Sequence, residues 1–147
     1  METIELAKTH LIEEQQTLVL VKEQQVVFQS NEKGIKALHT LYKNDRKLLQ
    51  DAVLADTVIG KAAAMICVEC GIKEIYASLI SDTAIEVLEK HLIPYSYAKK
   101  VSFIKNRDQS DLCPMEKIAL GAESTEQLMI NIEAFFEKMK QAAGTAK

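Results

Sequence analysis

Hydrophobic residues along the chain follow two kinds of pattern, one typical of helices and one typical of strands. Spacings of three to four residues, or apolar runs of one helix length, predict six helices over residues 2–14, 34–44, 58–70, 83–92, 114–121 and 124–141. Runs rich in β-branched residues predict four strands over residues 17–21, 25–29, 72–80 and 95–103. Residues 48–56 fit either a strand or a turn of helix.

The order of these elements predicts a three-layer α/β domain. Because helices alternate with strands after an initial hairpin, we expect a mixed sheet of four or five strands with helices on both faces. The strands at 72–80 and 95–103 are expected to be parallel and joined by the helix at 83–92. A single domain over residues 1–147 is expected, with a frayed tail at 142–147.

Local signals mark the predicted helix starts. Thr83 with Glu86, and Ser124 with Gln127, match the capping box, in which side chains satisfy free amides at a helix start. Pro114 suits the first position of a helix, where its missing amide hydrogen has no consequence.

Composition excludes several classes of function. The 147 residues carry a formal net charge of −3, which does not favour binding to nucleic acid or to an anionic membrane. Aromatic residues make up 5% of the chain and tryptophan is absent, so no platform for stacking bases is evident. No apolar run approaches the ~20 residues of a membrane span, and the start of the chain does not match a signal peptide. We therefore expect a cytoplasmic protein with reduced thiols and with no membrane or nucleic-acid partner.

The helix predicted at 58–70 is apolar on all sides after Lys61, which is typical of a buried helix. Gly71 suits the position just past its end, where a left-handed backbone is usually needed. At its start, Gly60 exposes backbone amides and Lys61 adds a positive charge, a combination that favours an anion such as phosphate. Alternatively, Gly60 serves packing and Lys61 reaches solvent or pairs with Asp56. Asp56 itself is a helix cap, a partner of Lys61 or a reactive carboxylate.

The three cysteines support different hypotheses. Cys67 and Cys70 form a C-x-x-C at the end of the buried helix, whereas redox pairs begin a helix, so we expect two core residues rather than a metal or redox site. Cys113 precedes Pro114 at a predicted helix start, where a thiol can become nucleophilic. Glu116, on the same helix, either faces solvent or binds ribose hydroxyls beside the site.

Two segments resemble a known family: Asp56-Thr-Val-Ile-Gly-Lys-Ala-Ala-Ala64 and Asp111-Leu-Cys-Pro-Met-Glu116. They are similar to the motifs of a prokaryotic domain-of-unknown-function family that carries the cytidine deaminase-like fold, over residues 8–137. The resemblance implies a deaminase-like three-layer α-β-α arrangement.

The chain departs from the zinc deaminases at the metal-binding motifs. Those enzymes place His or Cys, one residue and Glu at the start of the buried helix, and Pro-Cys-x-x-Cys at the start of the next. Here the two positions read Gly60-Lys-Ala-Ala63 and Ser81-Asp-Thr-Ala84, which contain no zinc ligand of that set. Zinc and zinc-dependent deamination are therefore not expected.

Our leading hypothesis is a protein that binds a nucleotide or another phosphorylated, anionic small molecule at the start of the buried helix. Asp56, Gly60, Lys61 and Glu116 would bind the ligand. In a variant of this hypothesis the ligand is ADP-ribose-like and is covalently attached to Asp56 or Cys113. The enzyme alternative is a hydrolase or transferase with Cys113 as the catalytic residue, and the third alternative is a regulatory homodimer without a ligand.

Overall fold

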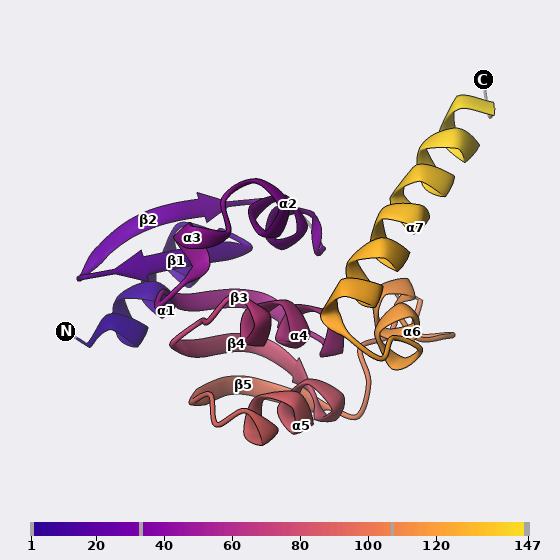
Figure 1. Ribbon diagram of the computed structural model, residues 1–147. Helices are drawn as coiled ribbons and strands as arrows, with labels where there is room; N and C mark the ends of the chain where they lie inside the picture. Colours follow the sequence, from indigo (N-terminus) through magenta and orange to yellow (C-terminus); the bar gives the residue numbers. More distant parts are fainter. Residues whose placement is uncertain (1, 33, 107, 146–147) are drawn as a thin grey trace.

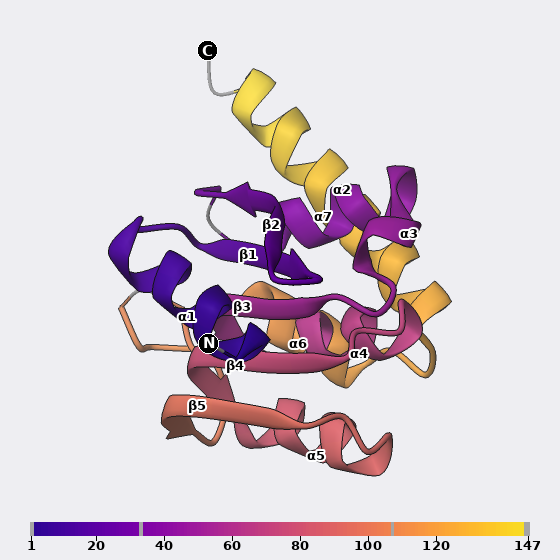
Figure 2. The same cartoon turned by 90° about the vertical axis from the view of Figure 1, so that its left-hand side faces the viewer.

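The computed structural model describes residues 2–32, 34–106 and 108–145. The elements, in chain order, are α1 Thr3–Glu13, β1 Leu18–Lys22, β2 Gln25–Ser30, α2 Lys36–Asn44, α3 Arg46–Leu49, β3 Val53–Ile59, α4 Lys61–Glu69, β4 Glu74–Ser81, α5 Asp82–Lys90, β5 Tyr95–Val101, α6 Pro114–Leu120 and α7 Thr125–Thr145. The five strands form one sheet in the order β2-β1-β3-β4-β5. Figures 1 and 2 show α1 on one face of this sheet and the helices α4 to α7 on the other. The predicted three-layer α/β architecture is confirmed.

The sheet is mixed. β1 pairs antiparallel with both β2 and β3, whereas β3, β4 and β5 are parallel to one another. The predicted hairpin and the predicted parallel pair on either side of α5 are both confirmed. The undecided segment 48–56 divides between the end of α3 and the first half of β3, the central strand. Because β3 continues to Ile59, the buried helix begins at Lys61 rather than at residue 58.

Residues of the central strand β3 pack against different helices on the two faces of the sheet. Val53 and Ala55 of β3 pack with α1, while Leu54 and Ile59 pack with the helices of the opposite face. On that opposite face α4 is the central helix, and its buried residues include three consecutive alanines, Ala62–Ala64. Small side chains let the helix lie close to the sheet. Gly71 has the left-handed φ of +73° that was predicted after this helix.

The two predicted capping boxes differ in outcome. At α7, the amide of Gln127 donates to the Ser124 hydroxyl at 3.1 Å, as predicted, although the Gln127 side chain bonds Asn131 instead. At α5 the prediction was wrong, because the helix starts earlier. Ser81 is the N-cap, and its hydroxyl accepts from the amide of Ala84 at 3.1 Å.

Replacing Ser81 with alanine should lower the free energy of unfolding by about 1–2 kcal/mol, the usual cost of losing a helix cap. Ser81 is fully buried, so no water replaces its hydroxyl. Urea unfolding monitored by circular dichroism measures the change. Ser124→Ala is the matched control, because that cap is exposed and its loss should cost less. Equal costs for the two variants would contradict this assignment.

The last helix extends beyond its predicted end. α7 continues to Thr145, past residue 141, and its C-terminal half projects from the body of the domain (Figure 1). The remainder of the predicted tail, residues 146–147, lies outside the described residues. No helix in the described part of the chain is long and apolar enough to cross a membrane.

Candidate functional site

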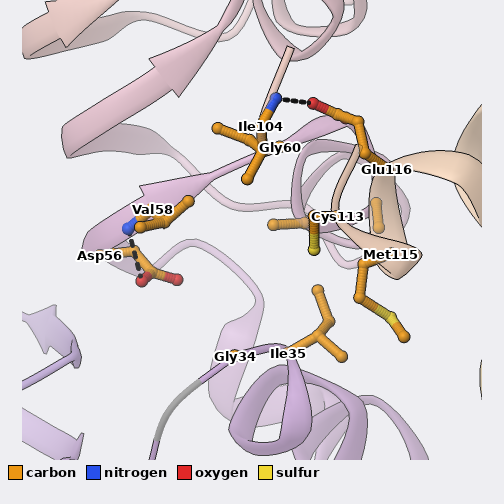
Figure 3. Close-up of a pocket in the computed structure, with 11 residues that line it drawn as sticks. Gly34, Ile35, Asp56, Val58, Gly60, Ile104, Cys113, Met115 and Glu116 are labelled. Carbon is orange, nitrogen blue, oxygen red and sulfur yellow. Dashed lines mark hydrogen bonds between the residues drawn. The ribbon is translucent and has the colours of Figure 1, made fainter. Parts of the chain in front are cut away.

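A cavity of about 80 Å³ lies where the second half of β3 meets the start of α4, and Figure 3 shows the side chains around it. Its apolar wall is formed by Ile35, Val58, Ala62, Ala63, Ile104 and Met115. The polar residues that line it are Asp56, Cys113 and Glu116, together with Gly34 and Gly60. Segments from four parts of the sequence, near residues 35, 58, 104 and 115, therefore meet at one cavity.

Asp56 contributes a buried carboxyl group to this cavity. It lies within β3, it is only 9% exposed, and its Oδ1 accepts a hydrogen bond from the amide of Val58 at 3.2 Å. Burial raises the pKa of Asp56 from 3.8 to about 8, and hydrogen bonds from residues 57 and 58 oppose this shift only in part. Within the described residues, Asp56 takes part in no ion pair. Burial therefore favours the protonated, neutral form of this carboxyl group.

Two sequence-based interpretations of Asp56 are wrong. It does not cap α4, because β3 continues to Ile59 and the N-cap of the helix is Gly60. It also does not pair with Lys61. The Lys61 side chain lines a separate hollow between α4 and α5, together with Thr83 and Glu86.

Glu116 is a second buried carboxyl group, only 2% exposed, in the first turn of α6. Its Oε1 accepts from the amide of Lys61 at 2.9 Å and from the hydroxyl of Thr83 at 3.2 Å. Its Oε2 accepts from the amide of Ile104 at 2.6 Å. The interpretation of Glu116 as a solvent-facing residue is therefore wrong. Its carboxyl group already accepts the hydrogen bond of the first amide of α4, where a phosphate was expected to bind.

A glycine is required at position 60 because neighbouring side chains lie close to its Cα atom, not because of its backbone angles. Its φ is −97°, which any residue can adopt. A Cβ atom at this position would lie 3.1 Å from Cγ1 of Ile104 and 3.2 Å from Oε1 of Glu116. The absence of a side chain at Gly60 thus leaves room for the Glu116 carboxyl group.

Cys113 is half-buried and its side chain points into the cavity between Asp56 and Met115 (Figure 3). It is the N-cap residue of α6, and its amide donates to the carbonyl of Ile104 at 2.9 Å. No histidine is among the residues lining the cavity, so a side-chain base of the kind that activates cysteine nucleophiles is missing from that lining. The role of Cys113 as a catalytic residue stays a prediction.

Cys67 and Cys70 lie apart from the cavity lining and are both buried. Burial raises the pKa of the Cys70 thiol to about 11 and holds the pKa of the Cys67 thiol well above its ordinary value. Both thiols are therefore protonated at neutral pH and are chemically unreactive. Within the described residues, no group of three or more His, Cys, Asp and Glu side chains could hold a metal ion. The residues do not fit a catalytic zinc.

Sequence reasoning missed two hydroxyl groups that are linked to Glu116. The hydroxyls of Ser81 and Thr83 lie 2.8 Å apart, and Thr83 links this pair to Glu116. The available signal was the run of polar residues Ser81-Asp82-Thr83 directly after a strand rich in apolar residues.

Fold and site together define a three-layer α/β protein whose candidate site is an apolar cavity containing two buried carboxyl groups. The chain belongs to the family described as a domain of unknown function, DUF1893, whose model matches residues 6–136. The resemblance seen in the sequence motifs is thereby confirmed. No curated protein matches the sequence.

Three solved structures are similar to this chain to different extents. The crystal structure of the DUF1893 family protein TM1506 from Thermotoga maritima matches with a TM-score of 0.81 and 23% identity, over 90% of this chain and 88% of that chain. It shows that the two chains share a fold. A dCMP deaminase from the cyanophage S-TIM5 matches with a TM-score of 0.46 and 14% identity, over 65% of this chain and 93% of that chain. A diaminohydroxyphosphoribosylaminopyrimidine deaminase/reductase from Thermotoga maritima matches with a TM-score of 0.43 and 17% identity, over 65% of this chain and 34% of that chain.

Proposed function

We propose that this protein binds a nucleoside or nucleotide reversibly, with the edge of the base in the cavity beside Asp56 and the remainder of the ligand outside. The observation that carries this proposal is the carboxyl group of Asp56, buried in a mostly apolar cavity without a cationic partner among the described residues. An isolated buried carboxyl group is costly to maintain, and such groups concentrate at functional sites.

The chemistry of a neutral carboxyl group suits a base. A protonated carboxyl group offers one O–H donor and one carbonyl acceptor side by side. Amide and amidine edges of nucleobases present the complementary acceptor and donor. Apolar side chains such as Ile35 and Met115 can contact the faces of a ring. Apolar and aromatic side chains pack against the base in the pockets of enzymes that bind nucleobases.

The size of the cavity limits what enters it. A volume of about 80 Å³ holds roughly three water molecules at about 30 Å³ each, so at most the edge of one ring enters it and a whole nucleotide does not. The amide of Lys61 already bonds Glu116, and the Lys61 side chain faces another hollow. A phosphate group would therefore extend away from the start of α4. Covalent attachment at Asp56 is not favoured, because a protonated carboxyl group is a poor nucleophile.

The proposal is tested by isothermal titration calorimetry at pH 6.5 with adenosine, guanosine, cytidine and uridine, and with their 5′-monophosphates. We expect at least one nucleoside to bind, with its monophosphate binding about equally well. Asp51→Asn, on the exposed surface, is a control that should bind like the native protein. Failure of all eight compounds to bind would overturn the proposal.

Binding should also depend on pH. If the ligand requires the neutral carboxyl group, affinity should fall up to tenfold per pH unit above the Asp56 pKa of about 8. Asp56→Asn keeps one donor and one acceptor without a titratable proton, so its affinity should not show this fall. Asp56→Leu should abolish binding. Because Cys113 and Glu116 also line the cavity, Cys113→Ser is titrated in parallel and should keep the native pH dependence. An Asp56→Asn variant that retains the fall would contradict the role of Asp56.

A further inference from the structure

We infer that Glu116 is a positioning residue: its carboxyl group fills an anion position at the start of α4 and holds two walls of the ligand cavity together. The consequence for binding rests on the function proposed above, whereas the anion position itself does not. The anion position at the start of α4 is therefore occupied by Glu116 and is not available to the ligand.

The first argument comes from the donors. Three groups from separate elements point to one carboxyl group: the amide of Lys61 at the start of α4, the hydroxyl of Thr83 in α5 and the amide of Ile104 after β5. The free amides and the dipole of a helix start favour a negative charge. No side chain of the N-cap residue supplies this charge, because the N-cap is Gly60. Glu116, more than 50 residues away along the chain, supplies it instead.

The second argument is the fit between Glu116 and Gly60. Oε1 of Glu116 would lie 3.2 Å from a Cβ atom at position 60, which is closer than most side chains permit. The carboxyl group is also almost fully buried, at 2% exposure, and both of its oxygens accept hydrogen bonds. The three donors, the glycine and the burial together describe a specific anion position rather than a chance contact.

The third argument links this position to the cavity. Gly60, Ile104 and Glu116 all line the cavity in Figure 3. Because the carboxyl group bonds the amides of both Lys61 and Ile104, it fixes the segment after β5 against the start of α4. The Ile104 side chain is thereby held as one wall. A ligand with a negative group directed at this wall would meet an occupied anion position and would be disfavoured.

The test is chemical rescue. Glu116→Gly removes the carboxyl group but leaves its three donors and a space that acetate can enter. We expect the thermal midpoint of this variant to fall and then to rise saturably with sodium acetate, beyond the effect of sodium chloride at equal ionic strength. The native protein and the exposed-site variant Glu123→Gly should show no such excess.

Amide resonances identify where the acetate binds. In ¹⁵N-labelled Glu116→Gly protein, the Lys61 and Ile104 amide signals should shift with acetate along the same saturation curve as the thermal midpoint. Equal effects of acetate and chloride, with these two signals unmoved, would overturn the inference. A general structural role for Glu116 would not move them selectively.

A variant that does not fold is also informative. If Glu116→Gly folds only when it is refolded in acetate, the inference is supported. If it folds in neither salt, Glu116→Asp decides, because it keeps a carboxyl group one methylene shorter. A midpoint closer to the native value than that of Glu116→Asn supports the inference, and equal midpoints overturn it. None of these measurements uses a nucleoside, so their outcome is independent of whether the proposed function holds.

Discussion

The native protein is expected to lose stability as the pH rises from about 4 to about 8, and replacing Asp56 with asparagine should abolish this dependence on pH. In the unfolded chain Asp56 ionises near its ordinary pKa of 3.8, whereas in the folded chain it keeps its proton up to a pKa of about 8. Between these values only the unfolded state releases the proton, so a rising pH favours unfolding.

The sign and size follow from this pair of values. Below pH 3.8 both states hold the proton and the carboxyl group makes no pH-dependent contribution. At about 1.4 kcal/mol per pH unit, a shift of about four units lowers the free energy of unfolding by about 5 kcal/mol by pH 8, as an order of magnitude. This is a large fraction of the 5–15 kcal/mol that is typical of a whole domain.

Urea unfolding at several pH values between 4 and 9 measures this effect. The difference in unfolding free energy between Asp56→Asn and the native protein should grow steadily in favour of the variant up to pH 8 and then level off. Asp51→Asn is the control, since that side chain is exposed and its replacement should leave the pH profile unchanged. Parallel profiles for Asp56→Asn and the native protein would show that Asp56 is ionised in the folded state at neutral pH.

A destabilising carboxyl group is informative about function. Asp56 lies in the central strand, where an apolar or amide side chain would avoid the cost of keeping a carboxyl group protonated at neutral pH. Residues that reduce stability in this way are typical of sites whose chemistry requires them. The expected stabilisation by asparagine and the expected dependence of nucleoside binding on the same residue are therefore two consequences of one neutral carboxyl group.

Replacing Glu116 with glutamine is expected to lower the free energy of unfolding by about 2–4 kcal/mol at pH 7, although the side chain keeps its shape. Glutamine has one acceptor oxygen, and its other end is an NH₂ donor. One of the amides of Lys61 and Ile104 would then face a donor in a buried position. Leaving a buried donor without an acceptor costs about 1–3 kcal/mol, and more where the lost partner was charged.

The same urea measurement applies, with Glu123→Gln as the exposed control, whose stability should change by less than about 0.5 kcal/mol. A Glu116→Gln variant as stable as the control would show that the three donors do not depend on a carboxylate. It would also contradict the anion position inferred above.

The amino-acid sequence by itself determined most of the elements, because their signals are local. The spacing of apolar residues in α1, the β-rich runs of the hairpin and the position of Pro114 at the start of α6 each depend on near neighbours along the chain. The same local chemistry selected four of the residues that line the cavity: Asp56, Gly60, Cys113 and Glu116.

Tertiary structure decided how these residues are used. The strand β3 is flanked by strands on both sides and covered by helices on both faces, so its apolar run could not be told from a helix by periodicity. Likewise, the local sequence around Glu116 and Lys61 shows neither that Glu116 is buried nor that Lys61 lines a hollow apart from the cavity. Both depend on contacts between α4, α6 and the segment after β5. Burial and the pairing of distant donors are properties of the packed chain, and for that reason the protonation of Asp56 and the anion position at Glu116 emerge only in three dimensions.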